Sequence, residues 1–318
     1  MCLGCGRART DIYMAHRGAM VSIASAAGEF SLPTPTGESD SLSTELSSLK
    51  LDFFNVFKGA TPRKPTCLYF TQGCCTMMDQ SDHLDTHTHG FLELNTKSFD
   101  LSKVQPQDFD YFLVLDLEGN IEILEFPVLL IDAKTLELVD FFHRFVRPRK
   151  LRKERLDQNV EQHFGKFGIN SIWHETAILF KDVIPQFEDW LAKHNVLTKE
   201  LGGHLNKAAF VTCGNWDIKT KIPDQCRVSR MELPPYFMEW INLKDIYLNF
   251  YGWRGRSMLA MMGQLQMPLV GNHHLGIDDA TNITRILQRL IVDGSVLRIT
   301  ARRNSDKKVE FLFENRIW

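Results

Sequence analysis

The sequence predicts an α/β protein in which helices flank a mixed β-sheet, and two observations support this fold class. Three β-rich runs follow one another between residues 112 and 146 with only short turns between them, which is typical of an antiparallel meander. Further along, apolar runs of strand length alternate with segments whose apolar residues recur at helical spacing. Because that alternation favours parallel strands joined by helices, the sheet is expected to contain both kinds of pairing.

The first expected strand is the apolar run at residues 112–119, which contains two carboxylates one residue apart near its end. Alternate residues of a strand point to the same face, so Asp116 and Glu118 are expected side by side. Leu115 and Leu117 then face the core. Two carboxylates this close repel each other unless a cation lies between them. The pair therefore predicts a divalent metal site, and the alternative is a strand end with two solvated acids.

Two longer β-rich runs, at residues 121–131 and 138–146, complete the expected meander. Gly119 and Asn120 are a turn signal of the hairpin kind, and residues 132–135 form the next expected turn. Strands joined by turns this short are expected to pair antiparallel.

The elements downstream alternate between helix and strand. In order, we expect a helix at 174–194, a strand at 208–213, a helix from Asp217, a short strand at 240–243, short helices at 245–251 and 258–265, and an amphipathic helix at 278–293.

Composition divides the chain into four parts. Residues 1–50 are rich in Ser, Ala, Gly and Thr and are expected to be disordered. Residues 51–105 form an extension without a pattern that we can assign. Residues 106–303 form the α/β domain, and residues 304–318 a basic, polar tail whose last apolar run can dock back.

The overall charge and composition exclude several classes of protein. A formal net charge of -2 gives no global basic field, so a nucleic-acid partner must be held by a local patch. No apolar run is long enough to span a bilayer, so no membrane partner is expected. The seven scattered cysteines fit a reducing compartment better than a disulfide scaffold.

Two groups of residues outside the α/β domain are of types that bind metals. They are the cysteines Cys2, Cys5, Cys74 and Cys75, and the histidines His83, His87 and His89. The cysteine spacings match a zinc site poorly. No cysteine or acid has a fixed spacing to the histidines, so we expect these to lie in an exposed polar loop.

Two further acidic segments follow the first one along the chain. Asp217 comes after the strand at 208–213, and His274 precedes Asp279 by five residues where the last helix begins. With Asp116 and Glu118, these segments resemble the three motifs of the DEDDh branch of the DnaQ-like (ribonuclease-T-like) 3′-to-5′ exonucleases. The resemblance implies the ribonuclease-H-like fold, which agrees with the expected mixed sheet.

Three stretches narrow the resemblance within that branch. Residues 122–128, 212–217 and 233–242 are similar to the enhanced-RNA-interference/histone-stem-loop exoribonuclease family, and most similar to its plant members. The resemblance covers about residues 106–303. It implies a 3′-to-5′ exoribonuclease that releases 5′-mononucleotides from RNA with a free 3′ end.

The resemblance also implies a chemistry. Asp116, Glu118, Asp217 and Asp279 would hold the metal, and four carboxylates without a soft ligand favour Mg²⁺ or Mn²⁺ over Zn²⁺. Two ions would together stabilise the attacking and leaving oxygens of the phosphodiester. In the resemblance, His274 occupies the position of the general base. A histidine suits that role because it titrates near neutral pH and can take a proton from water. His273 is its competitor for that role.

Several residues near these motifs are candidate contacts to nucleic acid. Trp216 can stack on a terminal base, the alternative being a core tryptophan. Gly119 and Asn120 differ from the residues usual in the family at the position of the terminal nucleotide. Arg147, Arg149 and Lys150 belong to the densest basic stretch, which can follow RNA phosphates or form a solvated loop.

The expected function is therefore 3′-end trimming of structured or small RNAs, in rRNA or small-RNA processing or turnover. A DNA exonuclease of the same fold and a non-catalytic RNA-binding module are the alternatives. Retention of all five motif residues argues against a binding module, which needs no carboxylate cluster. The sequence predicts no oligomeric state.

The start of the chain predicts a targeting signal. Up to Ala27 it carries three arginines and a single acid, Asp11, which is typical of an organelle transit peptide. The plant-type resemblance makes a plastid (chloroplast) the expected destination. If the segment is only a disordered tail, the cytoplasm or nucleus is the alternative.

Overall fold

The computed structural model describes residues 64–150, 152–198 and 203–317. The predicted disordered segment and transit peptide, with Cys2 and Cys5, lie outside the described residues. All described residues belong to a single compact unit.

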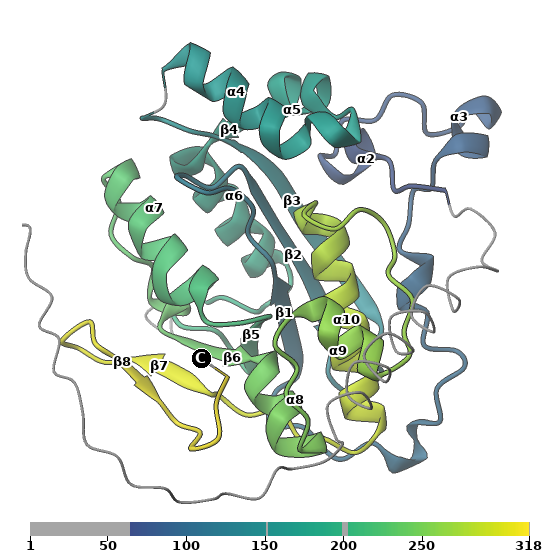
Figure 1. Cartoon of the computed structure of the whole chain (residues 1–318), viewed down its shortest axis with the longest axis vertical. Helices are drawn as coiled ribbons and strands as arrows, with labels where there is room; N and C mark the ends of the chain where they lie inside the picture. Colours follow the sequence, from purple (N-terminus) through teal and green to yellow (C-terminus); the bar gives the residue numbers. More distant parts are fainter. Residues whose placement is uncertain (1–63, 151, 199–202, 318) are drawn as a thin grey trace, which may run out of the picture. The chain divides into compact units, whose positions relative to one another are not determined.

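The strands form one mixed sheet, with eight strands in the described part of the chain (Figure 1). Their bounds are β1 (Tyr111–Leu115), β2 (Glu125–Asp132), β3 (Leu138–Arg147), β4 (Ile178–Leu179), β5 (Ala208–Thr212), β6 (Glu239–Asn242), β7 (Ala301–Arg303) and β8 (Val309–Phe311). The order across the sheet is β4-β3-β2-β1-β5-β6-β7-β8. The pairs β1/β2, β2/β3, β6/β7 and β7/β8 are antiparallel, whereas β1/β5, β5/β6 and β3/β4 are parallel. The predicted mixed sheet is confirmed.

Helices cover both faces of this sheet (Figure 1). Their bounds are α2 (Leu68–Thr71), α3 (Ser81–Thr86), α4 (Lys153–Phe164), α5 (Asn170–Thr176), α6 (Phe180–Lys193), α7 (Ile222–Ser229), α8 (Leu243–Tyr251), α9 (Met258–Gln264) and α10 (Gly276–Val292). A π-helical turn, η5 (Asp217–Lys221), leads into α7, and short 3₁₀ turns lie at Leu92–Leu94, Leu101–Lys103, Gly165–Phe167 and Pro235–Phe237.

The alternation of side chains along β1 builds two hydrophobic cores. Phe112 and Val114 point to one face and pack with α10, whereas Leu113 and Leu115 point to the other and pack with α6 and α7. All four side chains are fully buried. Because β1 is buried on both faces, it reads in the sequence as an unbroken apolar run. The residues that follow it are therefore held at the middle of the sheet.

The connection between β1 and β2 is not the predicted tight hairpin. β1 ends at Leu115 and β2 begins only at Glu125, so residues 116–124 form a loop. The loop is held from the side of α7. Lys221 Nζ donates to the carbonyl oxygens of Gly119 and Asn120, and Ile123 N–H donates to Gln225 Oε1 at 2.8 Å. These long-range bonds prevail over the local hairpin signal.

The predicted helix at 174–194 is also divided. Its first part belongs to α5, which ends at Thr176, and α6 begins only at Phe180. Between them Ile178 and Leu179 pair in parallel with the end of β3, at Val146 and Arg147. Helical spacing of apolar residues could not reveal this, because the interruption comes from a partner strand distant in sequence.

The residues before β1 pack against the domain. α2 contacts β3, and Gln288 of α10 donates to the carbonyl oxygens of Leu94, at 3.1 Å, and Leu136, at 2.9 Å. Residues 82–86, part of the stretch predicted as an exposed loop, lie in the short helix α3. At the other end of the chain, β8 pairs with β7 and extends the sheet. No helix in the described part of the chain is long and apolar enough for a membrane crossing.

Phe187 of α6 tests the core on the α6 face. The ring is fully buried, with ring centroids of Phe126 and Phe142 at 5.3 and 5.2 Å. Phe187→Ala should lower the free energy of unfolding by ~3–5 kcal/mol, because it leaves a cavity. Phe250→Ala, whose side chain is 39% exposed, is the matched control and should cost ~1 kcal/mol or less. Urea unfolding followed by circular dichroism measures both, and equal losses would contradict this description of the core.

Candidate active site

The two carboxylates of the first motif lie at the end of the central strand. Asp116 follows the last residue of β1 and is half-buried, and Glu118 is buried at 8% exposure. The backbone of Glu118 pairs with that of Glu125, the first residue of β2, in a β-bridge. The Glu118 N–H donates to the Glu125 carbonyl oxygen at 3.3 Å. Strand β1 therefore brings the acids to the sheet edge, and the start of β2 holds the second acid in place.

Asp279 comes to the same place on the first turn of α10. Its side chain is 3% exposed and accepts a hydrogen bond from the backbone N–H of His274, at 2.8 Å. Gly276 at the helix start lies so close to the sheet that an added Cβ would meet the carbonyl oxygen of Asp116 at 2.8 Å. Only glycine allows this approach of the helix to the first motif.

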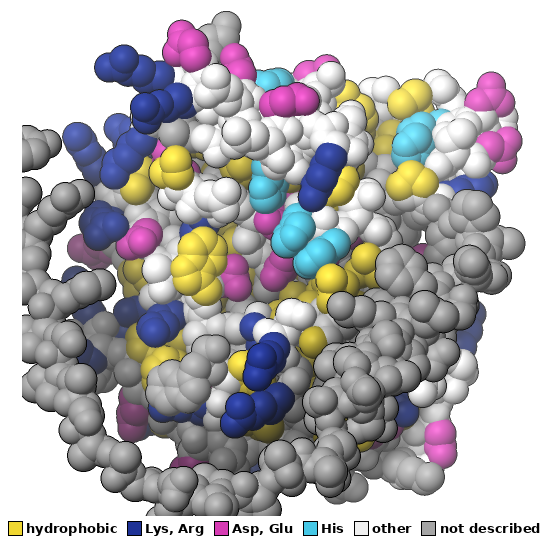
Figure 2. Space-filling view, in the orientation of Figure 1, with side chains coloured by type: hydrophobic (Ala, Val, Ile, Leu, Met, Phe, Trp, Pro, Cys, Tyr) yellow, Lys and Arg dark blue, Asp and Glu magenta, His cyan; other side chains and the backbone are white. Residues whose placement is uncertain are grey.

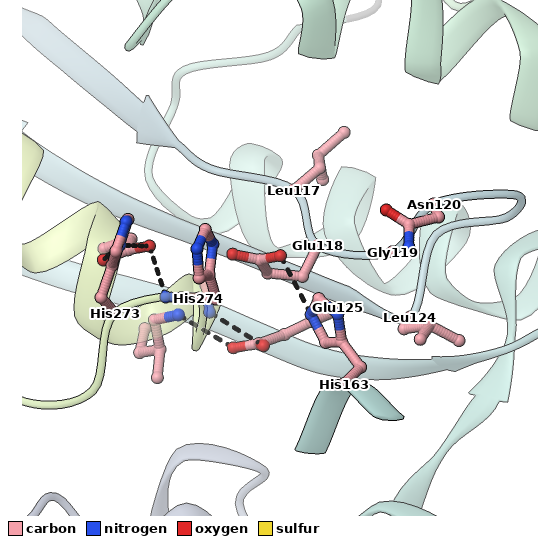
Figure 3. Close-up of polar contacts among 12 residues, drawn as sticks. Leu117, Glu118, Gly119, Asn120, Leu124, Glu125, His163, His273 and His274 are labelled. Atoms are coloured by element: carbon pink, nitrogen blue, oxygen red, sulfur yellow. Dashed lines mark hydrogen bonds and ion pairs between the residues drawn. The ribbon is translucent and has the colours of Figure 1, made fainter. Parts of the chain in front are cut away.

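A buried carboxylate on the sheet holds the start of α10. Glu125 is fully buried and accepts the backbone N–H groups of Gly276 and Ile277, at 2.9 and 2.8 Å (Figure 3). A carboxylate at a helix N-terminus satisfies donors that have no partner within the helix and interacts favourably with the helix dipole. Burial and the charge of Glu118 nevertheless raise the pKa of Glu125 to about 8. This contact sets the position of Asp279 relative to Asp116.

Asp217 reaches the site from the other side, at the first residue of η5 after β5. Its Oδ1 accepts the backbone N–H of Leu117 at 3.3 Å, and the side chain is 8% exposed. β5 pairs in parallel with β1, so the two strands end at the same edge of the sheet. Asp217 therefore lies beside the first motif, where the sequence analysis expects it.

The acids form one electrostatic cluster. Ligand atoms of Asp116, Glu118 and Asp279 lie within 4.8 Å of one another. Burial raises the pKa of Asp116 well above its ordinary value, and the charges of Asp217, Asp279 and Glu118 raise it further. Burial also raises the pKa of Asp217 and of Asp279 to about 6. A donor set of several carboxylate oxygens, strained by mutual repulsion, matches the coordination that a hard divalent cation requires.

Three histidines surround the cluster, and two of them contact a carboxylate. His273 Nδ1 lies 2.9 Å from Asp279 Oδ2, and His163 Nε2 lies 3.0 Å from Glu118 Oε2 (Figure 3). His274 differs, because no hydrogen bond among the described residues engages its ring; the ring stacks on His273 with centroids 3.8 Å apart. Burial and His273 lower the pKa of His274, while Glu118 opposes them. Its imidazole is therefore neutral at pH 7 and able to accept a proton.

The backbone of His274 explains why its ring is available. Its φ is +73°, in the left-handed region that a non-glycine residue seldom adopts. The N–H bond to Asp279 holds this conformation, and the side chain remains exposed. Strain of this kind persists where the surroundings enforce it, and it is common at functional sites.

The predicted nucleic-acid contacts beside the first two motifs lie at the site. Trp216 precedes Asp217 and is 50% exposed, so the core alternative is wrong. Lys221 Nζ lies over its ring at 4.5 Å from the centroid. Asn120 is exposed in the loop after the first motif. Gly119 has φ +111°, and an added Cβ would collide with the carbonyl oxygen of Glu122, so glycine is required there.

The predicted basic stretch is only partly available to a ligand. Arg147 donates to the carbonyl oxygens of His174 and Ala177 and lies over the Trp173 ring. The side chains of Arg149 and Lys150 are exposed, while their backbone N–H groups donate to the carboxylate of Glu122, which fixes this turn. Arg147 is thus already engaged within the chain, and its contact with RNA stays a prediction.

A groove of about 340 Å³ adjoins the second motif. It is lined by Gly214, Trp216, Lys219, Lys244, Phe311 and Arg316, among others. Lys219 and Arg316 both lie over the ring of Phe311, at 5.3 and 4.6 Å. Figure 2 shows this face: histidine and acidic side chains gather at its centre, and lysine and arginine side chains lie around them. Cations and exposed rings beside a carboxylate cluster can bind a phosphate backbone and its bases.

Two functional residues escaped the sequence analysis. His163 belongs to α4, a helix that was not predicted, although Leu156, Val160 and Phe164 recur there at helical spacing and are buried. Lys221 gave no signal, because its role depends on the carbonyl oxygens of a loop a hundred residues away.

Comparison with known proteins agrees with this geometry. The sequence model of the RNase T exonuclease family matches residues 112–287. An exonuclease domain-containing protein of Arabidopsis thaliana is 55% identical over 80% of this chain and 76% of its own length. Human ERI1 exoribonuclease 3 is 32% identical over 62% of this chain and 58% of its own length.

Solved structures are similar to the described domain. One is a 3′-exonuclease that recognises the 3′ end of the histone mRNA stem-loop, at 28% identity and a TM-score of 0.55, covering 66% of this chain and 73% of that one. Another is the nuclease domain of 3′hExo, a DEDDh family member bound to rAMP, at 32% identity and a TM-score of 0.51, covering 61% and 98%. These structures show the ribonuclease-H-like fold, and kinship with DEDDh exonucleases implies that the carboxylate cluster can hold divalent metal ions.

The raised pKa values predict how the metal-free protein responds to pH. Asp217 and Asp279 bind protons more tightly when folded, with pKa values of about 6, than when unfolded, at about 4. The cluster should therefore lower the free energy of unfolding as the pH rises from about 4 to about 7. Asp116→Asn combined with Asp279→Asn removes this repulsion. In EDTA, the melting temperature of this double variant should exceed that of the wild type by a margin that grows with pH.

Mg²⁺ should remove that margin by stabilising only the wild type. Asp189→Asn, an exposed acid of α6, is the control and should follow the wild type. A margin that does not depend on pH would contradict the clustering of these carboxylates.

Proposed function

Because this chain belongs to the exonuclease family, among relatives of the DEDDh 3′-to-5′ exoribonucleases, we propose that it trims the 3′ ends of structured or small RNAs. One observation carries the proposal. Four carboxylates from distant parts of the chain meet at one edge of the sheet, and an uncommitted imidazole lies beside them. Carboxylates that can hold divalent ions, with a base beside them that can take a proton from water, suit the hydrolysis of a phosphodiester.

The metal is assigned as Mg²⁺ or Mn²⁺, two ions per site, held by Asp116, Glu118, Asp217 and Asp279. Bound ions of this kind supply charge stabilisation for the attacking and leaving oxygens of a phosphodiester. The chain's own contribution is to hold the carboxylates in place before substrate arrives. The Leu117 N–H orients Asp217, the His274 N–H orients Asp279, and His163 contacts Glu118.

His274 is the better candidate for the general base. The His273 ring is engaged by Asp279 through Nδ1 and is thereby committed to positioning that carboxylate. The His274 ring is exposed, turned toward Glu118 (Figure 3), and neutral at pH 7 because its pKa is lowered. A neutral imidazole at the edge of the cluster can accept the proton of an attacking water.

The RNA 3′ end would approach along the groove beside Trp216. The exposed indole offers a stacking surface for a base, and Lys219 and Lys244 offer charge for the phosphates that precede it. The positive charge that binds RNA would thus be confined to this groove, as expected for a chain whose net charge is -2. RNA is favoured over DNA because curated relatives such as human ERI1 exoribonuclease 3 are named exoribonucleases, and because one similar structure is of a 3′-exonuclease that recognises an mRNA stem-loop.

Residues 1 to about 50 are proposed to direct the chain to a plastid. The support is the acid-poor, arginine-bearing start and the similarity of the domain to a plant protein. A fluorescent fusion of this segment should enter plastids in plant cells, and a diffuse signal in cytosol and nucleus would argue for a plain tail.

The activity and its polarity are tested on matched, labelled RNA and DNA oligonucleotides with Mg²⁺, Mn²⁺ or EDTA. RNA with a free 3′-hydroxyl should be shortened stepwise to 5′-mononucleotides when metal is present. RNA with a blocked 3′ end should persist. Preferred degradation of DNA would indicate a DNA exonuclease, and cleavage of circular RNA an endonuclease. Binding without cleavage under all conditions would indicate an RNA-binding module.

His274→Ala should lower kcat by ~10²–10⁴-fold with little change in RNA affinity, because a general base acts in the transition state. The wild-type pH profile should have an acid limb below the ordinary histidine value of about 6.5, since the pKa of His274 is lowered. That limb should disappear in His274→Ala and remain in His273→Ala. The reverse result would make His273 the base.

Trp216→Ala should raise KM for RNA ~5–150-fold, since base stacking contributes ~1–3 kcal/mol, and leave kcat nearly unchanged. Trp253→Ala is a matched control, because that indole is 48% exposed but stacks on Tyr251 of the same chain. Single-turnover kinetics separate the two parameters. Equal effects of the two substitutions would refute a specific role for Trp216.

A further inference from the structure

Four metal-binding side chains meet in the segment that precedes the sheet. Cys67, Cys75, His83 and His89 each bring one ligand atom within 4.8 Å of the others. The two sulfurs are 3.8 Å apart. His83 Nε2 lies 3.3 Å from Cys67 Sγ and 4.0 Å from Cys75 Sγ, and His89 Nε2 lies 3.6 Å from Cys75 Sγ. None of these residues belongs to the carboxylate cluster.

These separations are those of a tetrahedron around zinc. Zinc bonds of about 2.3 Å to sulfur and about 2.0–2.1 Å to nitrogen give a tetrahedron with an S–S edge of about 3.8 Å and S–N edges of about 3.6 Å. The sulfurs are too far apart for a disulfide, whose S–S length is about 2.0 Å. We propose that Cys67, Cys75, His83 and His89 bind one structural zinc ion.

A backbone N–H group donates to each of the two sulfurs. Phe70 N–H donates to Cys67 Sγ and Met77 N–H donates to Cys75 Sγ, each at 3.4 Å. Such N–H groups stabilise negative charge on a ligand sulfur. Zinc binding would release the two thiol protons to solvent. Cys74, which is exposed and outside the cluster, carries no such role.

The histidine rings are held by aromatic contacts. His89 stacks on Phe70, with centroids 4.9 Å apart, and His83 stacks on His87 at 4.7 Å. The backbone closes the loop, because Cys67 N–H donates to Thr88 O at 2.9 Å and thereby joins the first ligand to the neighbour of the last. The four ligands are thus assembled by contacts other than the metal.

The segment has little apolar core of its own. α2 and α3 have four and six residues, and α3 has no buried residue. Elements this short are not stable alone, so small units of this kind commonly rely on a metal or a disulfide. A four-ligand zinc site with no open position supplies that support.

The proposed site would brace the start of α10 through α2. Thr71 Oγ1 and Gln72 Nε2, at the end of α2, lie 2.8 and 3.0 Å from His143 Nδ1 on β3. Gln72 Oε1 accepts the Phe145 N–H, so its amide nitrogen faces His143 and the ring proton lies on Nε2. His143 Nε2 is 3.1 Å from Oε1 of Glu125, the residue that holds the start of α10.

Zinc content of the purified full chain tests the proposal first. Elemental analysis should find about one zinc per chain in the wild type and in Cys74→Ser. Cys75→Ser and His89→Ala should lose it. The variant with Asp116→Asn and Asp279→Asn should retain it, which separates this zinc from metal bound at the carboxylate cluster.

Zinc spectroscopy on the wild type does not depend on whether the variants fold. X-ray absorption at the zinc edge should show two sulfur and two nitrogen ligands at about 2.3 and 2.0–2.1 Å. A chelator that removes zinc should lower the melting temperature, and zinc but not Mg²⁺ should restore it. A wild type without zinc from zinc-supplied cells, zinc retained by Cys75→Ser, an all-nitrogen-and-oxygen shell, or a Cys67–Cys75 disulfide would each overturn the proposal.

Discussion

The hydrogen bonds from the start of α10 to the buried carboxylate of Glu125 are the contact on which the site depends. Glu125 lies at the first position of β2, and the two N–H groups that it accepts belong to Gly276 and Ile277. They join a strand near the middle of the sheet to a helix that begins 151 residues later. The cost of burying this carboxylate shows in its raised pKa, and it is offset by two backbone donors and the positive end of a seventeen-residue helix.

Fixing that one helix end places most of the reactive groups. Asp279 lies one turn into α10, and the loop before the helix carries His273 and His274. The absence of a side chain at Gly276 lets this turn lie against the Asp116 carbonyl group. The acids then come within a few ångströms of one another, where their repulsion is unfavourable without a cation. The fold therefore holds like charges close together before any ion binds.

The cationic surface is as local as the acidic one. Arg147, in the densest basic stretch, is held by backbone carbonyl oxygens and by an indole ring. The lysines beside the second motif, which are scattered in the sequence, line the groove together. Basic residues thus have to be judged by what already engages them. The same applies to the histidines, since two of the three rings at the site are engaged by carboxylates.

The sequence by itself determined the class of fold and predicted the acids of the candidate metal site. β1 and α10 are predictable because their patterns are local: an unbroken apolar run for a strand buried on both faces, and helical periodicity for a helix with one buried face. The order of the acidic motifs is also a property of the chain alone, so the resemblance to DEDDh exonucleases needed no coordinates.

Tertiary structure decided the features that arise from contacts between distant residues. The long loop after Asp116 replaces a hairpin because Lys221 of η5 and Gln225 of α7 bind it. The break before α6 exists because β3 offers a partner to Ile178. His163 became a site residue through a helix that folds back onto Glu118. The cysteines and histidines before the sheet have no spacing that marks them as one group. Only folding brings Cys67 to His83 and Cys75 to His89, because the distance between ligand atoms depends on chain path and not on separation in sequence.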